Sequence, residues 1–121
     1  MIYAILAYHE PAAITGLTSE EDAGLMDRLM KAHDRIGEAA TMGPAARLDF
    51  TEAAATLRKG VVIDGPFAET KEHLLGFYML ECDSLDRAVA AARELQQVNT
   101  SAVYEIRPVR LYLPGEPVRG G

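Results

Sequence analysis

The sequence predicts an α+β protein in which one β-sheet carries two helices on one of its faces. Three observations lead to this prediction. Short apolar and aromatic runs typical of strands recur along the chain, the first at 2–8 and the last at 102–109. Two longer segments with helical periodicity separate them, one over 19–40 and one beginning near 83. The order strand, helix, strands, helix, strand is that of a split β-α-β unit, so we expect a ferredoxin-like sheet with an extra hairpin.

The first strand, over residues 2–8, is predicted to lie inside the sheet. Both of its alternating sets of side chains are largely nonpolar. This pattern is typical of a strand that is covered on both faces, because a strand with one open face alternates apolar and polar residues. Residues 9–17 contain Pro11 and Gly16, so they are predicted to form a loop.

The first helix is predicted over residues 19–40. It begins with a capping box from Thr18 to Glu21, in which the two end side chains can each satisfy a free backbone N–H group. The sequence Met-Gly-Pro at 42–44 is expected to end it. One face of this helix carries Met26, Leu29, Met30, His33, Ile36 and Ala40.

The middle of the chain predicts a hairpin and a second inner strand. Residues 47–50 and 54–58 are weaker strand candidates. Lys59-Gly60 is expected to turn the chain into the apolar run 61–63. Residues 75–81 again carry apolar side chains on both faces, as an inner strand does.

A second helix and a last strand complete the predicted domain. The helix begins within 83–86, where Ser and Asp residues favour a helix start. Pro108 places the end of the strand 102–109 at an edge of the sheet, because proline cannot donate a hydrogen bond to a neighbouring strand. We therefore expect one domain over 1–113 and a mobile C-terminal tail over 114–121.

Composition narrows the class of protein. A chain of 121 residues can build one hydrophobic core but not two. The net charge of −6 repels phosphate backbones and anionic membranes, so we expect no nucleic acid or membrane partner. The N-terminus lacks the basic region of a signal peptide, and the lone Cys82 is interpreted as a buried thiol. Together these features predict a cytoplasmic protein.

The strands also predict an assembly. Two helices can cover only one face of a sheet whose strands are apolar on both faces. The other face would then exceed the apolar surface that a monomer normally exposes. A second copy of the chain is the simplest cover, so we expect a homodimer.

The segment 62–72 is the most informative stretch of the chain, because an apolar run breaks there into a charged turn. Gly65 allows a positive φ, Pro66 stiffens the chain, and Phe67 is expected to return to an apolar layer. Asp64 is the best candidate for a catalytic carboxylate, because it stands where an apolar strand ends. The other interpretation is structural, since an Asp before Gly often accepts backbone N–H groups of its own turn.

Further charged residues are candidates for ligand binding. Glu69, Lys71 and Glu72 follow the turn and form either a substrate-binding cluster or a solvated set that braces the loop. Arg107 and Glu105 share one face of the last strand, which is the face turned away from the helices. Arg107 is therefore either the anchor of a small anionic ligand or half of an interfacial ion pair.

Three histidines are candidates for proton transfer. His9 follows the first strand and could reach a cleft beside Asp64 if the strand ends converge, so we assign it as the catalytic partner of that residue. His33 lies within the apolar face of the first helix and is interpreted as a buried core residue. His73 follows the charged loop and is interpreted as a loop residue.

The chain lacks several well-known catalytic patterns. No Cys/His spacing suits structural zinc, and no Gly-x-Ser-x-Gly elbow, phosphate loop or dinucleotide fingerprint is present. We therefore expect no metal and no cofactor.

Residues 64–72, followed by 76–78, resemble the signature of the DGPF family, a branch of the YCII-related proteins. Residues 3–8 resemble the first strand of that family and 104–109 its last, so the likeness runs over about 1–110. The resemblance implies a dimeric α+β barrel, in which the sheets of two subunits meet. It also implies that some relatives use a His-Asp pair, whose histidine has no counterpart at the same position here.

Two functions remain open. One is a cofactorless enzyme that transfers a proton on a small organic acid or lactone-like substrate, with Asp64 and His9 catalytic and with Glu69, Lys71 and Arg107 binding the substrate. The other is a noncatalytic ligand-binding or regulatory module. The resemblance implies a possible sigma-factor partner for such a module, because DGPF-like genes often lie beside genes for extracytoplasmic-function sigma factors.

Overall fold

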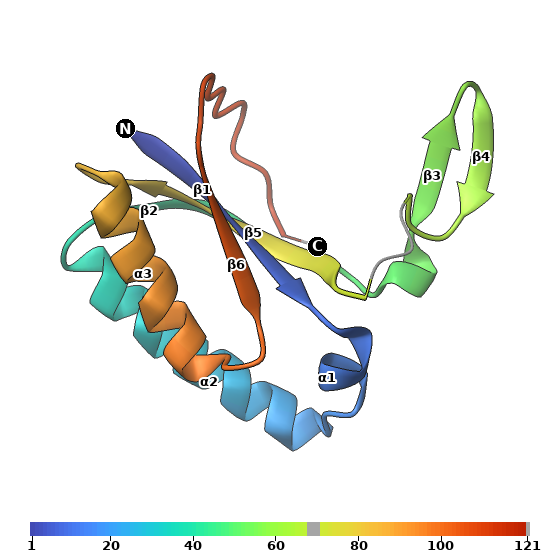
Figure 1. Ribbon diagram of the computed structural model, residues 1–121, viewed down its shortest axis with the longest axis horizontal. Coiled ribbons are helices and arrows are strands. Elements are labelled where there is room, and N and C mark those ends of the chain that lie inside the picture. Colours follow the sequence, from blue (N-terminus) through green and yellow to red (C-terminus); the bar gives the residue numbers. More distant parts are fainter. Residues whose placement is uncertain (68–70, 121) are drawn as a thin grey trace.

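The computed structural model describes residues 1–67 and 71–120. Their main element is a four-stranded antiparallel sheet with the strand order β2-β5-β1-β6 (Figure 1). A second, two-stranded sheet pairs β3 with β4. Along the chain the elements are β1 (Ile2–His9), α1 (Pro11–Thr15), α2 (Ser19–Gly37), β2 (Thr41–Arg47), β3 (Ala55–Arg58), β4 (Val61–Asp64), β5 (His73–Glu81), α3 (Leu85–Val98) and β6 (Val103–Pro108).

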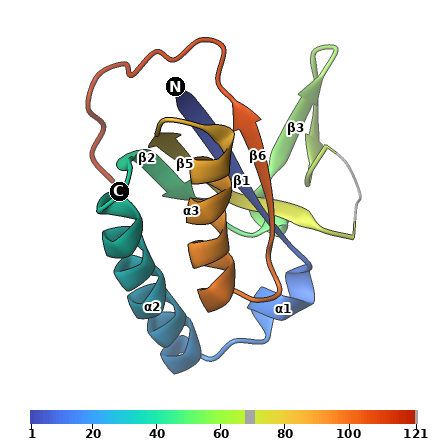
Figure 2. The same cartoon turned by 60° about the vertical axis from the view of Figure 1, so that its left-hand side comes forward.

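This arrangement confirms the α+β prediction and the ferredoxin-like order. The two long helices, α2 and α3, lie side by side on one face of the sheet (Figure 2). The strand β1 lies between β5 and β6, as its two apolar faces predicted. The strand β6, which ends at Pro108, lies at an edge.

The core lies between this face of the sheet and the two helices. Ile5, Leu80 and Leu95 are almost completely buried there, and each such aliphatic side chain contributes roughly 1.5–3 kcal/mol. Ala32 on α2 and Ala88 on α3 are also fully buried, and their small side chains let the helices approach the sheet closely. The core therefore follows from the apolar faces seen in the sequence.

Both helix starts are as predicted. Thr18 caps α2, where its hydroxyl accepts from the Glu21 backbone N–H at 3.1 Å, and the Glu21 carboxylate accepts from the Thr18 N–H at the same distance. Ser84 caps α3 by accepting from the Arg87 N–H at 3.3 Å. The end of α2 differs from the prediction, since the helix ends at Gly37 and not at residue 40.

The prediction around β2 was wrong. Residues 42–44, expected to end a helix, lie within β2, and 47–50 form no strand beyond Arg47. The register with β5 shifts between Met42 and Ala45, so Pro44 stands at an irregularity on an edge strand, where no donor is needed. The predicted loop 9–17 also contains the short helix α1, which Pro11 begins.

The hairpin predicted from 54–58 and 61–63 is present as β3 and β4, and it stands apart from the main sheet (Figure 1). Its turn residues Lys59 and Gly60 both have positive φ, at 49° and 80°, which suits a tight hairpin. Large apolar side chains on this hairpin are exposed. They are Leu57, Val61, Val62 and Ile63.

The turn after β4 is partly as predicted. Gly65 has a φ of 98°, which a residue with a side chain rarely adopts, and its carbonyl accepts from the Thr56 hydroxyl at 2.9 Å. Phe67 does not return to an apolar layer, because its side chain is 71% exposed. The Arg58 guanidinium lies over its ring instead, 4.7 Å from the centroid.

The other face of the sheet carries no described helix. Tyr104 and Ile106 pack against the core, so Glu105 and Arg107 point to this open face, as predicted. Leu111 and Leu113, beyond β6, are both more than 70% exposed. Within the described part of the chain, no helix has the length and apolar character needed to span a bilayer.

Candidate functional site

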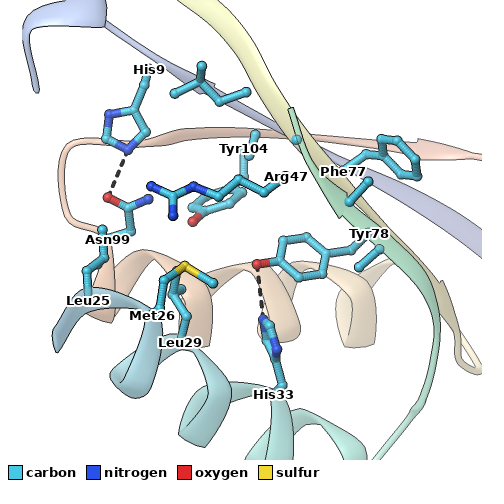
Figure 3. A pocket seen from close by; sticks show the side chains of 15 residues that line it. His9, Leu25, Met26, Leu29, His33, Arg47, Phe77, Tyr78, Asn99 and Tyr104 are labelled. Atoms are coloured by element: carbon cyan, nitrogen blue, oxygen red, sulfur yellow. Dashed lines mark hydrogen bonds between the residues drawn. The ribbon is translucent and has the colours of Figure 1, made fainter. Parts of the chain in front are cut away.

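A cavity of about 230 Å³ opens between the helix-covered face of the sheet and α2. Its walls are mainly apolar, with side chains such as Leu25, Met26 and Leu29 from α2 facing small residues of β1 and β2. Polar side chains from widely separated parts of the chain converge on it (Figure 3). These are His9, His33, Arg47, Tyr78, Asn99 and Tyr104.

His9, the last residue of β1, lies in this wall and is only 3% exposed. Its Nε2 lies 2.8 Å from Asn99 Oδ1, which can only accept, so Nε2 carries the proton (Figure 3). In the neutral ring, Nδ1 therefore holds the free lone pair. The Asn99 side chain also lies near Tyr104 (Figure 3) and partly offsets the rise that burial causes in the pKa of this phenol.

The Nδ1 atom of His9 has no hydrogen-bond partner among the described residues, although it is buried. A buried polar atom without a partner is uncommon and costs free energy. It is often explained by a catalytic role or by a ligand group that completes the site. His9 is therefore the residue of this cavity whose geometry most clearly indicates chemistry.

His33 and Tyr78 form a second polar pair across the cavity. Their Nε2 and Oη atoms lie 3.0 Å apart, and their rings meet edge to face at 5.1 Å (Figure 3). Burial lowers the pKa of His33, so the imidazole is neutral near pH 7. Burial also raises the pKa of Tyr78, and it raises that of Tyr104 to about 12, so both phenols keep their protons.

Arg47, at the end of β2, supplies the positive charge of the cavity. Its two terminal nitrogens donate to the two carboxylate oxygens of Asp22 on α2, at 2.6 and 3.2 Å. This hydrogen bonding lowers the pKa of Asp22 and raises that of Arg47, so both remain charged. No Asp or Glu lines the cavity itself among the residues described.

Of the predicted site residues that the structure describes, only His9 lines this cavity. Asp64 ends β4 and is exposed, and its carboxylate makes no hydrogen bond to the described residues. Lys71 pairs with Glu10 at 3.3 Å, and Arg107 lies on the open face of the sheet, where it is exposed. Glu69 lies outside the described residues. Neither Asp64 nor Arg107 lines this cavity, so the cleft expected to join them stays a prediction.

The two other histidines also have defined places. His33 was expected to be a buried core residue, but its ring is half-buried and lines the cavity. His73 begins β5, and its Nδ1 lies 3.1 Å from the Thr51 hydroxyl. In the described residues, no three His, Cys, Asp or Glu side chains gather as a metal ion would require.

The sequence did not single out four further cavity residues, Arg47, Tyr78, Asn99 and Tyr104. Arg47 had only been assigned to a weak strand, and Asn99 lies just beyond α3, where no motif marks it. Tyr78 and Tyr104 both lie in segments that the sequence predicts as strands. Tyr78 stands beside Phe77, and Tyr104 stands beside Glu105. Their face of the sheet was predictable, but their approach to His9 and His33 was not.

The fold and the cavity define a small ferredoxin-like α+β protein with a partly open, mainly apolar site between its sheet and α2. The model of the YCII-related domain matches residues 1–112. An uncharacterised protein of Rhizobium meliloti (strain 1021), R00369, is 48% identical over 121 residues, which cover 96% of this chain and 98% of that protein. The chain belongs to the YCII-related family.

Proposed function

We propose that this protein is a cofactorless enzyme that moves a proton on a small organic molecule held in the cavity under the sheet. The single observation that carries the proposal is the buried Nδ1 of His9, a ring nitrogen with a free lone pair and no partner in the described structure. A general base needs such a lone pair directed at a substrate proton.

The neighbours of His9 suit this role. When Nδ1 accepts a proton, the ring becomes positive, and its Nε2–H bond to Asn99 Oδ1 stabilises that charge. Asn99 also holds the ring in the tautomer that leaves Nδ1 free. It acts as a positioning residue, and His9 is the proposed catalytic base.

The pair His33 and Tyr78 supplies the complementary group. When the proton of neutral His33 lies on Nε2, this nitrogen donates to the Tyr78 oxygen, and the phenolic O–H is free to donate into the cavity. Loss of a substrate proton to His9 leaves negative charge on a nearby substrate oxygen. A hydrogen bond from Tyr78 would stabilise this charge.

Exchange of hydrogen for deuterium at carbon tests the proposal, because it detects removal of the proton whatever product forms afterwards. The protein is incubated in D₂O with a panel of small keto acids and lactones, and loss of the C–H signal is followed by NMR. We expect His9→Gln, which keeps a donor for Asn99, to lower the exchange rate by on the order of 10²-fold. His73→Gln, at the histidine outside the cavity, is the matched control and should exchange like the unaltered protein.

An equal rate in His9→Gln would contradict the proposal, as would the absence of catalysed exchange with every compound that binds. The second result would favour the alternative, a noncatalytic ligand-binding or regulatory module. The mainly apolar walls of the cavity support binding in either case. A sigma factor is the partner to test for such a module, by its capture in the presence and absence of ligand.

We also infer that the chain belongs to the DGPF branch of its family and acts in the cytoplasm as a homodimer. The turn sequence Asp64-Gly65-Pro66-Phe67 supports the branch assignment. The lone Cys82 is buried, so it needs no disulfide partner, which suits a reducing compartment.

A further inference from the structure

We propose that the ligand of the cavity carries a carboxylate, and that Arg47 binds it by exchanging its partner Asp22 for the ligand. This inference rests on the proposed function, since it names the chemical class of the molecule on which His9 acts. Asp22 would then be a built-in competitor, which occupies Arg47 until an anion enters.

The charges around the cavity favour an anion. The side chains that line it include one permanent cation, Arg47, and no carboxylate among the residues described. This is unexpected for a chain with a net charge of −6. The neutral donors Tyr78 and Tyr104 lie in the same wall and can complete the hydrogen bonds of a carboxylate.

Arg47 stands where two hollows meet. It lines both the inner cavity and an outer hollow of about 610 Å³, whereas Asp22 lines only the outer one. Rotation of the long arginine side chain can therefore move its guanidinium from a carboxylate on the outer side to one on the inner side. Leu75 also lines both hollows.

Breaking the ion pair between Arg47 and Asp22 costs little free energy. The pair is partly open to water, with side-chain exposures of 43% for Arg47 and 37% for Asp22, and such pairs are weak. Asp22 also lies within the first turns of α2, where the helix dipole and solvent stabilise a negative charge after Arg47 leaves. Inside the apolar cavity the attraction between a ligand carboxylate and the guanidinium is less screened by water, and hydrogen bonds from Tyr78 and Tyr104 would offset the lost hydration of the carboxylate.

The cavity also limits the rest of the ligand. A volume of about 230 Å³ with mainly apolar walls suits a compact molecule with one charged group and an apolar body. Benzoate has this chemistry, and benzamide has nearly the same shape without the charge. The two compounds are therefore the probes for the experiment.

Calorimetry at low ionic strength with both probes tests the inference. We expect Arg47→Gln to weaken benzoate binding by about tenfold or more, because a charged hydrogen-bonding group is lost. Asp22→Asn should tighten benzoate binding by up to about fivefold, because the competitor for Arg47 is removed. Neither substitution should change benzamide binding by a comparable factor.

The ion pair between Arg35 and Glu94 provides matched controls. It also joins an arginine to a carboxylate, with exposures of 49% and 37%, but neither residue lines the cavity. Arg35→Gln and Glu94→Gln should therefore leave benzoate binding unchanged. Thermal unfolding of each variant identifies any that fails to fold, and Arg47→Met then replaces Arg47→Gln as the variant without the positive charge.

Unchanged or weaker benzoate binding in Asp22→Asn would overturn the inference, and so would binding that is independent of Arg47. Either result can be distinguished from a failure of the proposed function. His9→Gln should still bind benzoate through Arg47, so proton exchange and carboxylate binding can fail separately.

Discussion

At the scale of single residues, the position of His9 depends on a partner ninety residues further along the chain. Asn99 accepts from Nε2, so the lone pair of the neutral ring lies on Nδ1. The sequence shows that residue 9 is a histidine, but it does not show which ring nitrogen carries the proton. The hydrogen bond to Asn99 that decides this exists only after α3 has packed against the sheet.

Asn99→Ala should remove this control of the tautomer. In the unaltered protein we expect the ¹⁵N NMR signals of the His9 ring to show a protonated Nε2, whereas the variant should show a mixture of both tautomers. Asn99→Asp, which keeps an acceptor, should restore the Nε2-protonated form. A protonated Nε2 that persists in Asn99→Ala would contradict the assigned role of Asn99.

His33 predicts a pH dependence of stability. Burial lowers the pKa of His33 from its ordinary value of 6.5, so the unfolded chain binds a proton before the folded chain does. Stability from this residue is therefore complete above about pH 6.5 and decreases as the pH falls through the lower pKa of the folded state.

His33→Gln should reduce this acid sensitivity, measured as the free energy of urea unfolding at pH 7 and pH 5. Tyr78→Phe removes the hydroxyl partner but keeps the imidazole, so it should retain most of the pH dependence. If the free energy of unfolding changes as much between pH 7 and pH 5 in His33→Gln as in the unaltered protein, the His33 imidazole is not the source of the pH dependence.

At the scale of elements, the sequence predicted those with strong periodicity and missed those with weak periodicity. The strands β1 and β5 and the helices α2 and α3 were recognised because their apolar residues repeat along one face or both. The strand β2 was misplaced because its residues are small and exposed. Its position depends on pairing with β5, which is not a local property.

Gly76 shows how closely β2 and β5 are fitted. A Cβ atom at this residue would lie 2.6 Å from the backbone oxygen of Ala46, so β2 would have to shift. Gly76 also pairs with Arg47 in the register of the two strands, so the shift would disturb the cavity.

We expect Gly76→Ala to lower the free energy of unfolding by about 1–3 kcal/mol. Gly37→Ala is the control, because a Cβ atom at this residue of α2 meets nothing within 4 Å. Alanine also favours a helix, so the control should be neutral or more stable by up to about 1 kcal/mol. Equal effects of the two substitutions in urea denaturation would contradict the strand-fit argument.

At the scale of the whole molecule, no helix in the described part of the chain covers the open face of the sheet or the hairpin β3–β4 (Figure 1). The open face of the sheet carries half-buried apolar side chains of β1, and the hairpin β3–β4 exposes Val62 to 67% and Leu57 to 71%. An isolated two-stranded hairpin is barely stable in water. A partner that packs on the hairpin would stabilise it and remove apolar surface from water.

We expect that partner to be a second copy of the chain, so light scattering at micromolar concentration should give twice the chain mass of 13.1 kDa. Val62→Lys should shift the equilibrium toward the monomer, because it places a charge in the apolar contact. Met30→Lys, at an apolar residue of α2 that is 55% exposed, is the control and should leave the mass unchanged. A monomer mass for the unaltered chain would rule out the homodimer.

The sequence by itself determined the class of fold, both helix starts, the hairpin and the inner position of β1. These features depend on apolar periodicity, caps and turns, which are properties of neighbouring residues. Only the tertiary structure decided the candidate site. Strand register and helix packing bring distant parts of the chain together there, and neither leaves a local pattern in the sequence. The polar residues that meet in this way are 9, 33, 47, 78, 99 and 104.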